Sequence, residues 1–212
     1  MTSIAPAARP VLADLIPRPS ARTRALALDA GLLVAGVAVL AALAKVSFFI
    51  GPVPITGQTI GVIVVGAALG ARRGAASLAL YAAVGLAGLP VFAGPVVGPA
   101  YVLSPSFGFI LGFIPAAFLA GWFAQRAWDR RPLLAFIGFL AASIVPFLVG
   151  VPYMALILAA VLGQSVTVES VMAAGVLPFL IPGVIKAAFV AVLLPLAWLG
   201  ARALDRKAPE AG

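Results

Sequence analysis

The sequence predicts an all-α integral membrane protein, a bundle of six transmembrane helices with both termini in the cytoplasm. Three observations predict this fold: the composition, the charge-free runs and the placement of basic residues. Of the 212 residues, 64% are hydrophobic and 9% are charged, whereas soluble domains have about 45–50% apolar and about 25% charged residues. The alternation of membrane barrel strands is missing from apolar segments such as 61–69, which favours helices.

The predicted spans follow from the runs without Asp, Glu, Lys or Arg, which cover 46–71, 74–125 and 132–168. A spanning helix needs roughly 20 apolar residues. Prolines and glycines divide the runs further, since they are typical of connections. We expect spans at 25–46, 58–71, 74–90, 107–125, 133–150 and 182–200. The apolar stretch from 152 to 179 is interrupted by Pro and Gly, so we expect short helices there, at the interface or folded over the bundle.

The basic residues set the orientation. Every Lys and Arg except Lys45 and Lys186 lies before the first span, after the last, or in the connections at 72–73 and 126–131. The connections on the opposite side, at 47–57, 91–106 and 151–178, contain no Lys or Arg, and their one charged residue is Glu169. By the positive-inside rule both termini are cytoplasmic in a cell membrane. We expect a loose tail at 1–24, one membrane domain at 25–203 and a second tail at 204–212.

The residue types exclude most catalytic chemistry. The chain contains no Cys and no His, which excludes disulfides, thiol catalysis and histidine-based metal or acid–base sites. It has no GxxxxGK[ST] motif, so a P-loop cannot supply ATP binding. We therefore expect no enzyme, no cofactor and no metal. The basic residues follow membrane topology, so they do not predict a nucleic-acid partner.

Lys186 is the leading candidate for function. An ionisable side chain inside a span is costly and usually functional, and its three donors suit a carboxylate, ureido or carbonyl oxygen. We expect the last span to begin near Pro182, because Pro is favoured in the first turn of a helix. Lys186 then lies one turn below the outer surface. For Lys45 we expect snorkelling to the interface.

Two further segments carry candidate residues. Thr56, Gln58 and Thr59 precede or begin the second span, where they either face a cavity or cap the helix. The connection at 88–105 combines Gly and Pro with aromatic residues. It therefore predicts either an outer lid between the third and fourth spans, over an apolar pocket, or an interfacial anchor.

The first span carries a ridge of small residues spaced four apart, at Ala27, Gly31 and Ala35. Small residues let helix backbones approach closely. The ridge serves either packing within the bundle or docking of a second membrane subunit.

From about residue 22 to 200 the sequence resembles the BioY family, the biotin-specific substrate-capture (S) components of energy-coupling factor (ECF) transporters. An ordered series of motifs carries the resemblance: VPITGQTIG at 53–61, GARRGAAS at 70–77, GLPVFAG at 88–94, LGF at 111–113, LPF at 177–179 and IK at 185–186. The resemblance implies a six-helix bundle with an outward-facing vitamin pocket. It also implies a membrane T component and two cytoplasmic ATPases as partners, with the ridge on the first span as the T-component docking face.

With this resemblance, Lys186 is expected to bind a polar end of biotin, and Thr56 and Gln58 to add hydrogen bonds. The expected apolar wall is aromatic, formed by Tyr81, Phe92, Tyr101 and Phe107, although Tyr81 could equally be structural. The family commonly has an Asp three residues before this Lys, and here that position is Gly183. The alternatives are a biotin precursor or another vitamin as ligand, or a stand-alone membrane carrier.

Overall fold

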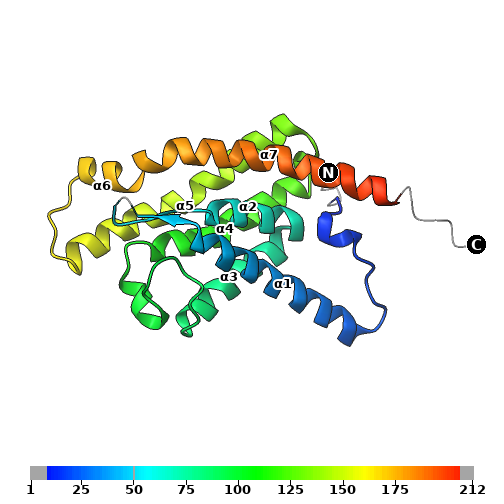
Figure 1. Ribbon diagram of the computed structural model, residues 1–212, viewed down its shortest axis with the longest axis horizontal. Helices are drawn as coiled ribbons and strands as arrows, with labels where there is room; N and C mark the ends of the chain where they lie inside the picture. Colours follow the sequence, from blue (N-terminus) through cyan, green and yellow to red (C-terminus); the bar gives the residue numbers. More distant parts are fainter. Residues whose placement is uncertain (1–8, 50, 206–212) are drawn as a thin grey trace, which may run out of the picture.

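The computed structural model describes residues 9–49 and 51–205, and they are mostly helical (Figure 1). A two-stranded antiparallel hairpin follows the first long helix and pairs Ser47 with Thr56. In chain order the elements are η1 (Leu12–Leu15), α1 (Arg22–Lys45), β1 (Ser47–Phe48), β2 (Ile55–Thr56), α2 (Gln58–Leu69), α3 (Ala71–Leu86), η2 (Gly98–Leu103), α4 (Phe107–Ala124), η3 (Trp128–Arg130), α5 (Pro132–Ala160), α6 (Val168–Gly175) and α7 (Leu177–Asp205).

Helix α4 forms the centre of the bundle. It packs against α2, α3 and α5, and 61% of its most apolar stretch is buried. The corresponding share is 11% for α1 and 17% for the stretch that contains α7. Helix α1 packs on α2 and α3, and α7 runs along α5 (Figure 1). The apolar surfaces of α1 and α7 therefore face outward, as lipid-facing helices do.

Small residues allow the central helices to approach closely. A Cβ atom added at Gly66 would lie 2.4 Å from the carbonyl oxygen of Ala117, and one at Gly121 would lie 2.3 Å from the backbone nitrogen of Ala71. Gly70 alone separates α2 from α3, with a positive φ of 85°. Helix packing in a membrane depends on such contacts, because lipid tails compete equally for apolar surface.

The chain is a multi-pass membrane protein. Among the described residues, four helical stretches are long and apolar enough to cross a membrane: α1, α4, α5 and the stretch 168–203. Helices α2 and α3 are shorter, with 12 and 16 residues. Each of the six predicted ranges overlaps one of the long helices or α2 or α3, although the range 74–90 runs past the end of α3 at Leu86.

Two further predicted boundaries, in α5 and α7, are wrong. Helix α5 does not end at 150 but continues through Pro152 to Ala160. Helix α7 begins at Leu177, so Pro182 lies inside it rather than in its first turn. Only α6, in the middle of the 152–179 stretch, is a short helix. Prolines are tolerated within membrane helices because neighbouring groups satisfy the freed carbonyls, so they are poor boundary markers here.

The bundle has two chemically different ends. The basic end contains Arg72, Arg73, Arg126 and Arg130, and η1 lies there against α2. The loop end contains the β1–β2 hairpin, the connection 87–106, and α6 with the segment 161–167 before it.

The part of the expected loose tail that the structure describes is packed at the basic end. Val11 is 1% exposed, the Arg9 amide donates to the carbonyl of Gln125, and Asp14 pairs with Arg73.

Candidate ligand-binding pocket

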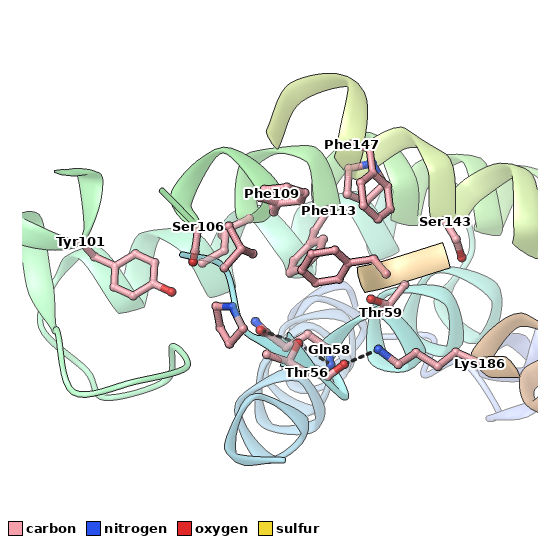
Figure 2. Close-up of a pocket in the computed structure, with 15 residues that line it drawn as sticks. Thr56, Gln58, Thr59, Tyr101, Ser106, Phe109, Phe113, Ser143, Phe147 and Lys186 are labelled. Atoms are coloured by element: carbon pink, nitrogen blue, oxygen red, sulfur yellow. Dashed lines mark hydrogen bonds between the residues drawn. The ribbon is translucent and has the colours of Figure 1, made fainter. Parts of the chain in front are cut away.

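A pocket lies toward the loop end, between α2, α4, α5 and α7 (Figure 2). Its cavity volume is about 50 Å³, and the adjoining space open to solvent brings the empty volume to about 530 Å³. Its walls combine aromatic rings with a few polar side chains. The lining residues are Val53, Pro54, Thr56, Gln58, Thr59, Tyr101, Ser106, Phe109, Ile110, Phe113, Ser143, Pro146, Phe147, Phe179 and Lys186.

Lys186 reaches the pocket from α7. It lies nine residues after the first residue of the helix, about 14 Å along the axis, and is therefore deeper than the single turn that we predicted. Its side chain is half-buried, and Nζ donates a hydrogen bond of 2.6 Å to the backbone carbonyl of Thr56 (Figure 2). This bond joins α7 to the β2–α2 junction and holds the ammonium at one end of the pocket.

Gln58 is held in one orientation by a chain of hydrogen bonds. The Thr56 hydroxyl donates to Gln58 Oε1 at 3.0 Å, and Gln58 Nε2 donates to the Tyr81 hydroxyl at 2.8 Å. Tyr81 in turn donates to the carbonyl of Val91 at 2.8 Å. The first turn of α2 is thereby linked through a buried tyrosine to the 87–106 connection.

Four consecutive carbonyls of that connection accept hydrogen bonds from side chains. Besides the bond from Tyr81 to Val91, Lys45 Nζ donates to Pro90 at 2.7 Å and to Phe92 at 3.1 Å. Tyr101 donates to the carbonyl of Ala93 at 3.4 Å. We expected Lys45 to snorkel, but its ammonium instead holds this segment against the end of α1.

The pocket has an aromatic wall that differs from the predicted one. Phe109 packs edge-to-face on Phe147 at 5.6 Å and stacks with Phe179 at 6.2 Å between ring centroids. Of the four predicted aromatic residues, Tyr101 lines the pocket and the other three lie behind its surface.

Those three residues form a supporting layer. Phe92 lies between Tyr81 and Tyr101, with ring centroids 5.4 and 4.3 Å away. Phe107 packs between Tyr101 and Tyr153. They fix the position of Tyr101, and Tyr81 also orients Gln58.

Sequence reasoning missed most of the aromatic wall. Ser106, Phe109, Ile110 and Phe113 occupy positions i, i+3, i+4 and i+7, which places them on one helical face. Ser143 and Phe147 share a face of α5 in the same way. This spacing, with a polar residue inside a charge-free span, was the available signal.

The pocket has two polar ends of different character. Lys186, Thr59 and Ser143 lie at one end in Figure 2, Tyr101 and Ser106 lie toward the other, and phenylalanine rings lie between. Burial raises the pKa of Tyr101 to about 12, so its hydroxyl stays protonated at neutral pH. Among the lining residues Lys186 carries the charge, and none is acidic. The site can therefore hold an elongated ligand that is polar at both ends and apolar in the middle.

The predicted docking ridge lies away from the pocket. Ala27, Gly31 and Ala35 are all exposed on α1. A Cβ atom added at Gly31 would meet no atom within 4 Å. Within the described chain, the ridge is therefore not used for close helix packing.

The fold and the pocket define a membrane-embedded protein that binds a small molecule among its helices. Residues 18–203 match the model of the BioY family. The chain belongs to this family.

Named relatives agree in length and sequence. The chain is 33% identical to the probable biotin transporter BioY of Pyrococcus horikoshii, over 78% of this chain and 93% of that protein. It is 36% identical to the biotin transporter BioY of Rhizobium etli, over 81% of this chain and 91% of that one. A similar solved structure is the S-component for biotin from an ECF-type ABC transporter, with a TM-score of 0.58 and 25% identity, over 83% of this chain and 91% of that one.

Proposed function

We propose that this chain is the membrane substrate-binding (S) subunit of a biotin importer. The observation that carries the proposal is the pocket, which has polar groups at both ends and an aromatic wall between them. Biotin has a ureido ring at one end, a carboxylate at the other and an apolar thioether ring and alkyl chain between. The names of the relatives in the BioY family support the same ligand. The chain captures the vitamin and performs no reaction on it.

The proposed topology has six spans, with the basic end in the cytoplasm and the loop end outside. The basic residues of the connections support it through the positive-inside rule. The 87–106 connection then lies on the outer side, where it serves as a lid. Hydrogen bonds from Lys45 of α1 and Tyr81 of α3 to residues 90–92 support this role, because they hold the connection against the bundle, and Tyr81 also contacts the lining residue Gln58.

We propose that partner subunits energise transport: a membrane T component and two cytoplasmic ATPases. The exposed ridge on α1 supports docking of the T component, because small exposed residues permit close approach of a second helix.

A ridge substitution tests this docking. Gly31→Leu is expected to reduce co-purification with co-expressed T component and ATPases while biotin binding is retained. Gly200→Leu is the matched control, since Gly200 is also exposed on a helix with no atom near an added Cβ. Equal loss of partners in both variants would contradict docking at the ridge.

The ligand is tested by titrating the detergent-purified protein with biotin and, in parallel, with dethiobiotin. Saturable biotin binding is the expected result. Tighter binding of dethiobiotin would identify a biotin precursor as the ligand. Folded protein that binds neither compound would overturn the proposed ligand, while the fold and the family would stand.

A further inference from the structure

We infer that a cavity at the basic end of the bundle binds an anionic phospholipid. The phosphate of the headgroup would lie between Arg72 and Arg126, and an acyl chain would lie along Phe118 and Trp122 of α4. This site is separate from the candidate ligand pocket, and the inference does not depend on biotin as the ligand. It makes a membrane lipid of defined charge a second ligand of the chain.

The cavity lies where η1 meets the junction of α2 and α3 and the last turns of α4. Its volume is about 400 Å³, which is within the range of about 300–1,000 Å³ typical of small-molecule sites. The lining has a polar side and an aromatic side, to which belong Asp14, Arg72, Arg73 and Gln125, and Phe118 and Trp122, respectively. A ligand that fits it is therefore polar on one side and apolar on the other.

The charges that line the cavity are unequally paired. Arg73 forms ion pairs with Asp14 at 2.7 Å and with Asp29 at 3.6 Å. Asp14 is thus already used by the protein. Arg72 is exposed, and among the described residues it forms no ion pair. The lining therefore keeps a positive charge at Arg72, which can pair with an anion from outside the protein.

Arg126 places a second positive charge beside the cavity. Its guanidinium carbon lies 3.3 Å from the centroid of the Trp122 ring, which lines the cavity. One of its N–H groups donates to the backbone carbonyl of Trp122 at 3.1 Å. A guanidinium has five donors and binds phosphate oxygens in pairs, so Arg126 keeps donors for a phosphate. Two guanidinium groups therefore border one cavity.

The aromatic side favours a lipid over a free phosphate. Helix α4 is the most buried of the long helices, yet Phe118 and Trp122 are 46% and 36% exposed. They are four residues apart and share a face, and Pro115, about one turn earlier, is exposed as well. This strip runs from the cavity toward the middle of the membrane, where acyl chains lie. A free phosphate would leave it unused.

The depth of the site fits the boundary between headgroups and acyl chains. Tryptophan is enriched at this boundary, and Trp122 separates the arginines from the apolar strip. Under the proposed topology the basic end is cytoplasmic, and basic pockets between spans on that side bind anionic headgroups. The expected ligand is therefore a lipid of the inner leaflet.

The test compares phosphatidylglycerol, which is anionic, with phosphatidylcholine of the same acyl chains, which has no net charge. Each lipid is added to delipidated, detergent-purified protein, and native mass spectrometry measures the bound fraction. Phosphatidylglycerol is expected to bind at least about fivefold more tightly, the value of one basic residue beside anionic lipid. Equal binding of the two lipids would overturn the inference. The comparison uses the unmodified protein, so it does not depend on the folding of a variant.

Two soluble anions separate a lipid from a free phosphate. Inorganic phosphate and glycerophosphoglycerol, which is the headgroup without acyl chains, are added in excess to the complex with phosphatidylglycerol. Neither is expected to displace the lipid, because neither contacts Phe118 and Trp122. Displacement by either anion would identify a site for free phosphate groups and overturn the lipid as ligand.

A pair of double variants locates the site. In Arg72→Gln with Arg126→Gln the ratio of the two lipid affinities is expected to fall to near one. Arg22→Gln with Arg24→Gln is the matched control, because it removes the same charge from exposed positions at the same end, outside the cavity. It should keep the wild-type ratio. Equal loss of the preference in both would contradict the site and indicate a general attraction of the basic end for anionic lipid.

A protein partner is the competing occupant. If the Arg72 and Arg126 double variant lost co-purification with co-expressed T component and ATPases while the lipid ratio stayed at the wild-type value, the cavity would be a protein-docking surface instead, and the inference would be wrong.

The fluorescence of Trp122 provides an independent readout. Phosphatidylglycerol with brominated acyl chains is expected to quench the tryptophan fluorescence more than brominated phosphatidylcholine does. Trp122→Phe should remove this excess quenching. Trp128→Phe should retain it, because Trp128 does not line the cavity. Excess quenching that persists in Trp122→Phe would contradict the placement of the acyl chain.

Discussion

The two ends of the bundle treat charge in opposite ways. At the basic end, the carboxylates of Asp14 and Asp29 pair with Arg73, and Asp29 also pairs with Arg18. Asp129 is fully buried and accepts a 2.6 Å hydrogen bond from the indole of Trp198. Toward the loop end, Lys186 contacts a backbone carbonyl and lacks an acidic partner among the described residues.

This difference indicates that paired charges at the basic end serve stability and that the charge in the pocket serves ligand binding. At the basic end, the ion pairs of Asp14 and Asp29 with Arg73 hold η1, α1 and α3 together, and the hydrogen bond from Trp198 to Asp129 joins α7 to η3. The charge in the pocket keeps donors available, which is what a ligand site requires. Substitutions at the basic end should therefore change stability, whereas substitutions in the pocket should change ligand affinity.

The largest expected effect is on affinity. Lys186→Ala removes the charged donor of the pocket and is expected to weaken biotin binding about 10- to 100-fold, the value of a hydrogen bond to a charged group. The thermal unfolding midpoint should change little, because the ammonium makes one hydrogen bond to the protein. Titration and thermal unfolding of the same preparation measure both. Unchanged affinity would remove Lys186 from the site.

The reverse pattern is expected at Asp129. Asp129→Ala leaves the buried indole N–H of Trp198 without its acceptor, which should reduce the free energy of unfolding by about 1–3 kcal/mol. Biotin affinity of the folded protein should not change, because Asp129 and the pocket lie toward opposite ends. Denaturation in detergent and a titration would detect both effects. If Asp129→Ala lowered biotin affinity without lowering stability, the distinction between a stabilising basic end and a ligand-binding pocket would be contradicted.

A smaller effect is expected at Tyr81, which links the pocket to the 87–106 connection. Tyr81→Phe removes the hydroxyl that accepts from Gln58 and donates to Val91. Losing this link should weaken biotin binding about fivefold, because a neutral hydrogen bond contributes about 1 kcal/mol. Tyr153→Phe is the matched control, since its hydroxyl also bonds to the 87–106 connection, at Val102, but makes no bond to Gln58. Equal effects in both variants would contradict a specific role for Tyr81.

The smallest effect is a pH dependence of stability. Burial raises the pKa of Asp129 above its ordinary value of 3.8, against the lowering effects of the Trp198 hydrogen bond and Arg130. Above pH 3.8 the Asp129 carboxyl group therefore keeps its proton in the folded state after the unfolded state has lost it. The free energy of unfolding then decreases as the pH rises through this interval.

Asp129→Asn keeps an acceptor for Trp198 and removes the titration. Unfolding midpoints measured across acidic to neutral pH should therefore decline less steeply with rising pH in the variant than in the wild type. Identical slopes would exclude Asp129 as the source of the dependence.

Much of the fold could be predicted because membrane helices are marked by charge-free runs. The positions of α4 and the shorter α2 follow directly from them, whereas α1 contains charged residues and follows from the apolar residues between Asp29 and Lys45. The extensions of α5 and α7 could not be predicted from Pro152 and Pro182, because these prolines read as breaks in a sequence but are accommodated within long helices.

The polar part of the candidate pocket was more predictable than the apolar part. Thr56, Gln58 and Lys186 stand out as polar residues next to apolar spans, and the structure brings all three to one pocket. Phe113 and Phe147 do not stand out in this way, because an aromatic residue in an apolar span can face either lipid or the interior. The packing of α4 against α5 decides whether these side chains face the lipid or the interior.

The most direct test of the account is an experimental structure of the purified protein with biotin bound. The account predicts ligand density between Lys186 and Tyr101, with a polar end of biotin within hydrogen-bonding distance of Lys186 Nζ and the apolar part of the ligand against Phe109. Density for biotin at any other place, with this pocket filled only by water, would contradict the central claim that the pocket captures the ligand.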